Sequence, residues 1–491
     1  MTEDFVPLRY AYQNALREAL TAFTERKETA DGSAFLYRGA NLRYALERIL
    51  FPRLTQHENL FALFCASKKN GRAVGIVEDA VEKEIALLLC GADAQIRVKS
   101  GGGRAAFKRL AYRLGARPAK RMLRLLRTLV NRARRSPRAD ILFYAINEQF
   151  ARYAKPVARA LPISFAYASF SPPVRAYLAE TGSPYAASSV LGSRIARFSD
   201  ASSVLEEYGL DRAYDLALEC LDWVRPKRIV VFEGCSYMDE IMNRAGRARG
   251  IPCICIQHGW VGIKELWTTE LHFSKMLVWG AGFDELLAPD NPHQRFVSVG
   301  NFAVAAKRLP KERLPGANLT LGFFLQKKSG LLDEHRLRAF KELALWAART
   351  FPSLTVVVRT HPAATASEGI DSREKNLVLM PPQTHRLEDM LRVIDVSFSI
   401  YSSTILESIE AGRLPVIVNI VSLPSYQPDL AIRGAAIETT SIEETKEVIR
   451  KLAEGVLRPD AFIPALNKAR EDYFAAGGED AIRNIVRELT N

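Results

Sequence analysis

Two residues capable of acid–base chemistry, Glu233 and His258, follow neighbouring predicted strands in the middle of the chain. The apolar run 229–232 directly precedes Glu233, and the run 253–256 ends two residues before His258. The residues between the runs have a helical pattern that ends at Gly250, so the order is strand, helix, strand. Because parallel strands joined in this way end at one edge of a sheet, we expect a carboxylate and an imidazole in one crevice. Either group could take a proton from a substrate hydroxyl.

Each of these two residues also has a purely structural explanation. Glu233 could cap the helix that begins near Tyr237, and His258 could be satisfied by a backbone carbonyl. The chemical interpretation requires a pKa near the working pH, which burial at a strand end can produce. The sequence leaves both explanations open.

A row of hydroxyl groups follows a predicted strand of the C-terminal half. Ser402, Ser403 and Thr404 come after the apolar run 396–400 and open a helical segment. Free backbone N–H groups at a helix start bind phosphate, so three hydroxyls in this turn favour a phosphate site over a simple N-cap. Glu407, one turn later, could reach a ribose hydroxyl or be an ordinary first-turn glutamate.

Cationic and imidazole side chains follow two other predicted strands of the same half. Arg359 and His361 come after the run 354–358, and Pro362 favours an extended backbone at His361. We expect His361 to donate to a phosphate or a base and Arg359 to add charge, although a histidine in this place can be purely structural. Lys327 lies in a loop that could contact a diphosphate or remain in solvent, and Walker spacing is missing there.

The positive charge of the protein is concentrated in one segment, residues 104–138. The 491-residue chain has a net charge of +13, and this segment contains thirteen Lys or Arg and no Asp or Glu. Its second half predicts a basic amphipathic helix, which favours contact with an anionic membrane surface. Packing of its leucines on the core of the protein is the alternative. We expect no nucleic-acid partner, because no aromatic platform accompanies the charge.

Cysteine usage and the chain start bear on the compartment. The six cysteines show no CxxC pair and no His/Cys metal spacing, which indicates a reducing compartment and no metal site. The first residues lack the pattern of a signal peptide, and no uncharged apolar stretch reaches the roughly 18–20 residues that span a bilayer. We therefore expect a cytoplasmic protein, with any membrane contact peripheral and made through 104–138.

Predicted strands and helices alternate from Asp140 onward, which indicates an α/β fold. We expect two doubly wound Rossmann-like domains facing a cleft, preceded by a mainly helical extension. The predicted boundaries are 1–138 for the extension, 139–306 for the first Rossmann-like domain and 307–491 for the second, which includes the terminal helices. The predicted strands are 141–146, 163–168, 229–232, 253–256, 276–279, 296–299, 319–325, 354–358, 377–380, 396–400 and 416–418.

Four short motifs occur in an order that resembles a known enzyme family. They are Phe232-Glu233-Gly234, Gln257-His258-Gly259, His361-Pro362 and Ser402-Ser403. The order is similar to that of bacterial GT-B glycosyltransferases of surface polysaccharides: sialyl- and polysialyltransferases, capsule Kdo transferases and CDP-glycerol glycerophosphotransferases. Phe232 stands where the sialyltransferases have an acidic residue, and Gln257 where the glycerophosphotransferases have tryptophan. The resemblance covers residue 140 to the C-terminus.

This resemblance implies transfer of a sugar from a CMP-activated donor of the Kdo or sialic-acid type to a glycan or lipid-linked acceptor, in capsule, O-antigen or lipopolysaccharide synthesis. It makes 139–306 the acceptor domain and 307–491 the nucleotide-binding domain. It places His361, Ser402 and Ser403 at the phosphate and makes Glu233 the base, with His258 orienting the donor or sharing the proton. Such enzymes need no metal and no cofactor beyond the nucleotide-sugar. His258 as the base, and Glu233 as a nucleophile in a double displacement, stay open.

Three other functions fit the same residues. They are a CDP-glycerol-type phosphotransferase, a UDP-sugar transferase or epimerase of the same fold, and a non-catalytic peripheral scaffold. Replacing Glu233 and His361 by alanine separates the last from the enzymes, because a scaffold tolerates both changes.

Overall fold

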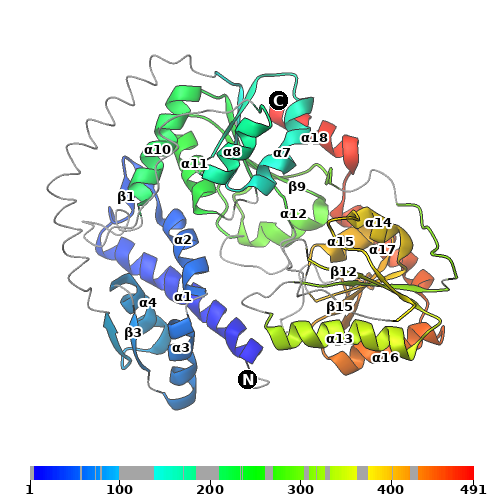
Figure 1. Ribbon diagram of the computed structural model, residues 1–491. Helices are drawn as coiled ribbons and strands as arrows, with labels where there is room; N and C mark the ends of the chain where they lie inside the picture. Colours follow the sequence, from blue (N-terminus) through cyan, green and yellow to red (C-terminus); the bar gives the residue numbers. More distant parts are fainter. Residues whose placement is uncertain are drawn as a thin grey trace.

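The computed structural model (Figure 1) describes most of the chain outside the basic segment. Of the residues predicted to form the site, Glu233, Lys327 and Pro362 lie outside the described part, as do residues 104–137. The described residues are 5–55, 58–71, 73–77, 80–98, 138–169, 171–183, 209–232, 234, 236–259, 269–303, 309–316, 318–326, 332–361, 374–400, 402–420 and 430–491.

The first large sheet has six parallel strands in the order β10-β9-β8-β7-β5-β6. Most of its strand residues are buried and apolar, as expected for a parallel sheet covered by helices. The strands are β5 (Ile141–Tyr144), β6 (Phe165–Ala168), β7 (Arg228–Phe232), β8 (Cys253–Ile256), β9 (Lys275–Val278) and β10 (Phe296–Ser298). The helices between them are α7 (Glu148–Ala160), α8 (Pro172–Glu180), α10 (Leu210–Val224), α11 (Tyr237–Ala248), α12 (Ala281–Leu287) and the 3-10 turn η4 (Ala288–Asp290).

The second large sheet also has six parallel strands, in the order β13-β12-β11-β14-β15-β16. Its strands are β11 (Thr320–Phe324), β12 (Thr355–Arg359), β13 (Leu377–Leu379), β14 (Val396–Ser399), β15 (Leu414–Val418) and β16 (Ile437–Thr439). Its helices are α13 (Glu334–Thr350), α14 (Leu387–Val393), α15 (Thr404–Glu410), α16 (Ile442–Ala453), η6 (Pro459–Phe462) and α17 (Ile463–Tyr473). The prediction of two doubly wound Rossmann-like domains is confirmed by these strand orders.

The last helix, α18 (Gly478–Thr490), returns to the first half and packs against α7 (Figure 1). The Lys275 ammonium on β9 fixes it by an ion pair with the Glu488 carboxylate, at 2.8 Å. Where the chain crosses back, Gly477 forms an isolated parallel β-bridge with Asn301. The two connections between the halves, one after Asn301 and one before Gly477, therefore lie side by side. Although the sequence boundary assigns residues 307–491 to one domain, α18 belongs in space to the first sheet.

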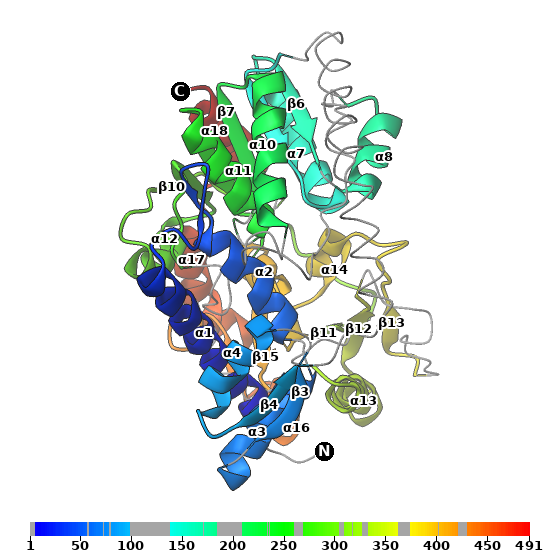
Figure 2. The ribbon, with the colours of Figure 1, turned by 90° about the vertical axis from the view of Figure 1, so that its left-hand side faces the viewer.

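The N-terminal region is mainly helical, as predicted, and contains two small two-stranded sheets. Its elements are α1 (Phe5–Ala30), β1 (Leu36–Tyr37), β2 (Ala40–Asn41), α2 (Arg43–Thr55), α3 (Glu58–Asn70), β3 (Val74–Val77), α4 (Ala80–Cys90) and β4 (Gln95–Val98). Helix α2 packs against α11 of the first half (Figures 1 and 2). Within the described residues, no helix is long and apolar enough to cross a membrane.

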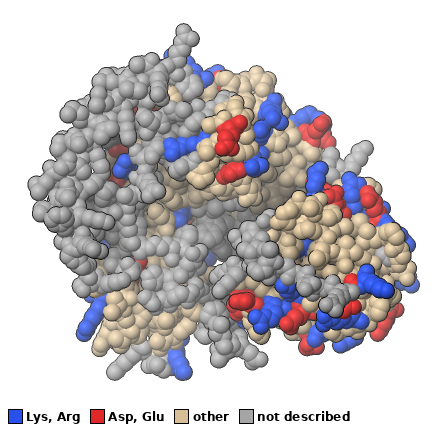
Figure 3. Space-filling model, in the orientation of Figure 1, with Lys and Arg blue, Asp and Glu red and all other residues tan. Residues whose placement is uncertain are grey.

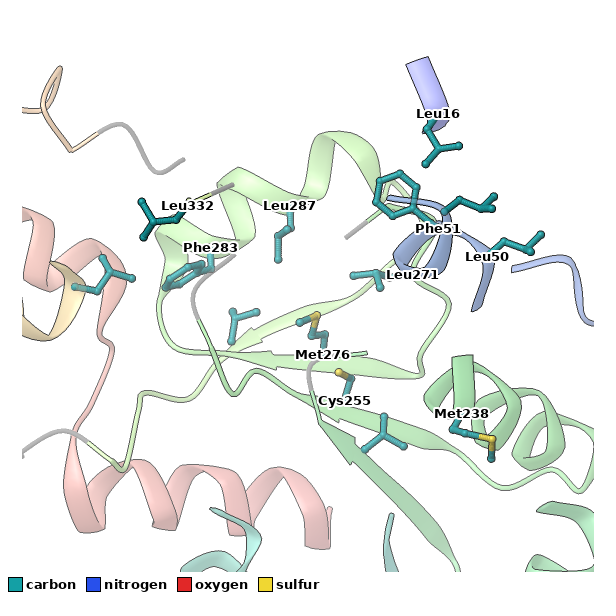
Figure 4. Close-up of a cluster of buried hydrophobic side chains, with 14 of the residues drawn as sticks. Leu16, Leu50, Phe51, Met238, Cys255, Leu271, Met276, Phe283, Leu287 and Leu332 are labelled. Atoms are coloured by element: carbon teal, nitrogen blue, oxygen red, sulfur yellow. The ribbon is translucent and has the colours of Figure 1, made fainter. Parts of the chain in front are cut away.

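A continuous apolar core joins the N-terminal region to the first sheet. Figure 4 shows Leu50 and Phe51 of α2 near Leu271 and Met276, all of which are buried. A buried ion pair adds to this contact, because Arg48 of α2 lies 2.8 Å from the Glu240 carboxylate of α11. The N-terminal extension is therefore part of the folded first half.

Candidate functional site

Each large sheet has one position where the winding direction reverses. In the first sheet β6 and β7 lie on opposite sides of β5, and in the second sheet β12 and β14 lie on opposite sides of β11. Ligands of open α/β sheets bind beyond the carboxyl ends of the strands at such a reversal. The second sheet has the strand order 3-2-1-4-5-6 of dinucleotide-binding folds. The reversal points therefore define where each half can hold a ligand.

Ser402 and Ser403 lie at the reversal point of the second sheet, between β14 and α15. The Ser402 hydroxyl accepts a bond from the Thr404 N–H at 3.3 Å, and the Ser403 carbonyl accepts from Leu406 and Glu407. Ser403 occupies the N-cap position, yet its side chain makes no capping bond to the helix backbone. The simple N-cap explanation therefore does not account for this serine, and its hydroxyl lies instead against Glu407.

Glu407 and Thr404 carry polar atoms that have no hydrogen-bond partner among the described residues. Glu407 Oε2 and Thr404 Oγ1 are buried, and no described residue forms a hydrogen bond with either. Burial, with repulsion from Glu388, raises the pKa of Glu407 to about 7, although a hydrogen bond from Ser403 opposes the shift. Buried polar atoms are normally paired, so two unpaired ones in one helical turn indicate a place for ligand groups.

Arg359 has a structural role that the sequence did not reveal. From the last position of β12, its Nη1 donates to the carbonyls of His385 and Met380, at 2.8 and 3.3 Å. Burial lowers the pKa of this guanidinium. Arg359 thus braces the turn before α14. The backbone carbonyls of that turn satisfy Nη1, so this nitrogen needs no ligand as a partner.

His361 is half-buried and follows β12 by two residues. Since β12 is next to β11 and β11 is next to β14, His361 and Ser402 leave the sheet at the same edge, two strands apart. The structure therefore places His361 and Ser402, the predicted imidazole and hydroxyl groups, at one edge of one sheet.

In the first half, the ends of β7 and β8 are adjacent, because Phe232 pairs with Ile256. Residue 233 follows β7 but lies outside the described residues. The N-cap of α11 is Ser236, which forms a capping box with Asp239. The capping role considered for Glu233 is therefore filled by other residues.

The turn that carries His258 is fixed on both sides by Gln257 and Gly259. The buried Gln257 side chain donates to the Gly259 carbonyl at 3.0 Å and accepts from the Trp279 N–H at 2.9 Å. The half-buried His258 ring packs edge-on against Phe150 and Tyr153 of α7, with centroid distances of 4.7 and 4.6 Å. The result is an imidazole held in a defined orientation beside the end of β7.

Sequence reasoning missed the residues that support His258. Phe150 and Tyr153 are three positions apart on α7, so they share one helix face, and this spacing was the available signal. Gln257 was interpreted only as a motif position. The contact with Trp279 joins residues 22 positions apart and has no local signature.

No group of three or more His, Cys, Asp or Glu side chains in the described part of the chain could hold a metal ion. Metal independence stays a prediction. On the face shown in Figure 3, acidic and basic side chains are mixed over the second half.

The sequence matches no known family model, and no curated protein matches it significantly. Among solved structures, the glycotransferase of kitacinnamycin has a TM-score of 0.49 at 17% identity, over 72% of this chain and 99% of its own. MurG of Acinetobacter baumannii has 0.46 at 15%, over 71% and 98%. A putative UDP-N-acetylglucosamine 2-epimerase from Listeria monocytogenes has 0.49 at 12%, over 70% and 94%. At these scores the similarities carry no argument, and the fold assignment rests on the strand orders of this chain.

Proposed function

We propose that this protein is a GT-B-type glycosyltransferase that takes a sugar from a nucleotide-activated donor. The supporting observation is the reversal point of the second sheet. There Ser402 and Ser403 open α15, and buried oxygens of Thr404 and Glu407 have no described partner. A nucleotide supplies the missing partners, since phosphate oxygens suit N–H and hydroxyl donors and ribose hydroxyls suit a carboxyl group.

For the donor, we propose a CMP-sugar of the Kdo or sialic-acid type. The His361-Pro362 and Ser402-Ser403 motifs resemble those that grip CMP in the sialyltransferases, and both leave the same sheet edge here. Glu407 would bond a ribose hydroxyl, and Lys327 would add positive charge near the phosphate. Arg359 would act indirectly, through the turn that it braces.

In the proposed reaction, Glu233 takes the proton of an acceptor hydroxyl, and that oxygen bonds to the anomeric carbon of the donor. The bond from this carbon to the nucleotide phosphate breaks, and its electron pair leaves with the nucleotide. Hydroxyl and N–H groups around Ser403 stabilise the departing phosphate, which removes the need for a metal ion. His258, on the neighbouring strand end, orients the donor or shares the proton.

For the biological setting, we propose a bacterial surface polysaccharide as the acceptor pathway and a glycan or lipid-linked molecule as the acceptor. The basic segment 104–138 supports this setting, because thirteen positive charges without a negative one attract an anionic membrane surface. The enzyme would work at the cytoplasmic face of that membrane.

A thermal-shift comparison of CMP, CDP, UDP, GDP and ADP, each with and without EDTA, tests the proposal. A ligand at a hundred times its dissociation constant stabilises the native state by about 2.7 kcal/mol. We expect CMP or CDP to raise Tm preferentially, EDTA to have no effect, and Ser403→Ala to abolish the shift. Ser441→Ala is the matched control, because Ser441 caps α16 in the same half and should leave the nucleotide shift intact.

The other outcomes identify the competing functions. Stabilisation by UDP alone would replace the CMP donor with a UDP-sugar, for a transferase or an epimerase. Detection of phosphoglycerol transfer from CDP-glycerol would indicate the phosphotransferase. If no nucleotide raised Tm, the enzymatic proposal would fail and the scaffold would remain.

A further inference from the structure

Trp279 lies directly after β9 and makes two hydrogen bonds to the residue before His258. Its backbone N–H donates to Gln257 Oε1 at 2.9 Å, and its indole Nε1 donates to the Gln257 carbonyl at 3.2 Å. The tryptophan is 3% exposed and Gln257 is 1% exposed, so water does not compete for these bonds. The backbone on the N-terminal side of His258 is therefore fixed to Trp279.

The other side of Trp279 is in contact with the segment that joins α17 to α18. The Phe474 ring stacks on the indole, with 6.0 Å between ring centroids and 17° between planes. The Ala475 N–H donates to the Trp279 carbonyl at 2.9 Å. This segment carries the chain from the second half back to the first, so Trp279 lies between the His258 turn and the connection of the two halves.

The next residue, Gly280, shows how closely the two backbones approach. A Cβ atom at Gly280 would lie 2.5 Å from the carbonyl oxygen of Asp472, so only glycine fits there. On α12, a Cβ atom at Gly282 would lie 2.4 Å from the Tyr473 ring. With no free space in this contact, a displacement of residues 472–475 displaces the end of β9.

Helix α17 is in turn linked to the helix that opens at Ser403. The Arg470 guanidinium of α17 pairs with the Glu410 carboxylate of α15 at 3.6 Å, and Glu410 is 3% exposed. Glu410 is less than one turn beyond Glu407, the residue proposed to hold the ribose. An open cavity of about 500 Å³ borders residues 474–477, Glu410 and Arg470.

We propose that Trp279 is a positioning residue that sets the orientation of the His258 turn according to the position of α17. Through the α17 contact with α15, the same residue relates the His258 turn to the nucleotide-binding helix, and this second step rests on the proposed function. A sugar-nucleotide that shifts α15 would thereby adjust the imidazole that serves the transfer.

The test measures how fast diethyl pyrocarbonate modifies His258, using peptide mass spectrometry on the full chain. Trp279→Phe keeps an aromatic ring against Phe474 and removes the indole donor, whereas Phe474→Leu keeps that donor and removes the stacked ring. We expect each change to raise the modification rate of His258 several-fold. His293, which is exposed, is the internal standard, and Trp346→Phe on α13 is the matched control.

Kinetics give the second readout. Trp279→Phe should lower kcat by about tenfold or more, as misplaced groups do, while the donor KM and the nucleotide-induced Tm shift stay the same. If the His258 rate relative to His293 stays at the wild-type value in both variants, the positioning role is refuted. Because the modification assay needs no nucleotide, it stays decisive even if no nucleotide binds the wild-type protein, a result that would refute the proposed function instead.

Discussion

The two reversal points of this molecule differ in how completely their polar side chains are bonded to the protein. In the first half, the side chains beyond the strand ends are bonded to the protein: Asn147 caps α7, Ser236 caps α11, and Gln257 is tied to Trp279 and Gly259. In the second half, the Ser403 side chain forms no capping bond. A site that must orient one reacting group needs the first arrangement, and a site that must accept a polar ligand needs the second.

The N-terminal region extends this contrast, because it is attached to the first half through buried charge. Glu240 on α11 is fully buried between Arg48 of α2 and Arg244, at 2.8 and 2.6 Å. Burial alone would raise the pKa of this carboxyl, but the two guanidinium groups outweigh it and lower the pKa. Helix α11, which begins beside the end of β7, is thereby attached to α2 of the N-terminal region.

The largest effect expected from this contrast concerns His258. If His258 shares the proton as proposed, His258→Gln should lower kcat by on the order of 10²–10⁴-fold, because it removes that group from a fixed turn. Nucleotide binding should be unchanged, since the residues predicted to bind the phosphate belong to the other sheet. Steady-state kinetics and calorimetric titration with CMP check this separation.

Glu233→Gln is the companion variant that identifies the base. The residue whose loss removes the acidic limb of the kcat/KM pH profile is the proton acceptor. A His258→Gln enzyme with wild-type kcat would show that the fixed turn serves packing alone. Retention of stereochemistry at the anomeric carbon would make Glu233 a nucleophile.

The next effect tests the attachment of the N-terminal region. Arg48→Met leaves the buried Glu240 with one partner fewer, and should lower the free energy of unfolding by about 3 kcal/mol. Denaturant titration followed by circular dichroism measures the change. Lys227→Met, which removes the exposed pair with Asp140, is the control and should cost less than about 1 kcal/mol. An equal loss of unfolding free energy in both variants would mean that the buried Arg48 pair stabilises the protein no more than the exposed Lys227 pair.

Most of the second-sheet strands could be predicted from the sequence, because buried parallel strands are uninterrupted apolar runs. The run 377–380 became β13 (Leu377–Leu379), and 354–358 became β12, shifted by one residue. Strand β16 (Ile437–Thr439) was missed, since its short, half-buried sequence Ile-Glu-Thr has no apolar run. Pattern reasoning therefore finds the strands that contain an apolar run, the edge strand β13 included, and misses the edge strand β16, which lacks one.

Within the candidate site, the sequence predicted the placement only of residues that follow strands closely. Ser402, Ser403 and His258 fall in this class, because the carboxyl ends of parallel strands share one edge. The partners of Arg359 and Gln257 were not predictable, since Arg359 donates to His385 and Gln257 accepts from Trp279, both more than 20 positions away. Such contacts depend on how strands are ordered, which a local pattern does not encode.

An effect of at most similar size sharpens the contrast through pH. With the pKa of Glu407 raised to about 7, its unfolded form ionises from about pH 4.5 while the folded form stays neutral until about pH 7. Folding stability is therefore lost across this window, by up to about 3 kcal/mol, and the loss is constant above it. Glu407→Gln should match the wild type near pH 4 and exceed it by this amount at pH 8. Denaturant midpoints at the two pH values check this, and an equal difference at both would contradict it.

The smallest expected effect is a difference in unfolding free energy between two variants, each changed at the start of a helix at one of the two reversal points. Asn147 accepts the Phe150 N–H at 2.9 Å, so Asn147→Ala should lower the unfolding free energy by about 1 kcal/mol. Ser403 makes no capping bond and would lose only the hydrogen bond of its hydroxyl to Glu407, so Ser403→Ala should cost less than Asn147→Ala in the absence of ligand. The order should reverse with nucleotide present, because only Ser403→Ala loses the ligand-induced stabilisation. Thermal unfolding of both variants with and without CMP measures all four values. Equal costs without ligand would show that Ser403 is an ordinary cap, and the contrast between the two halves would then rest on Glu407 and Thr404 alone.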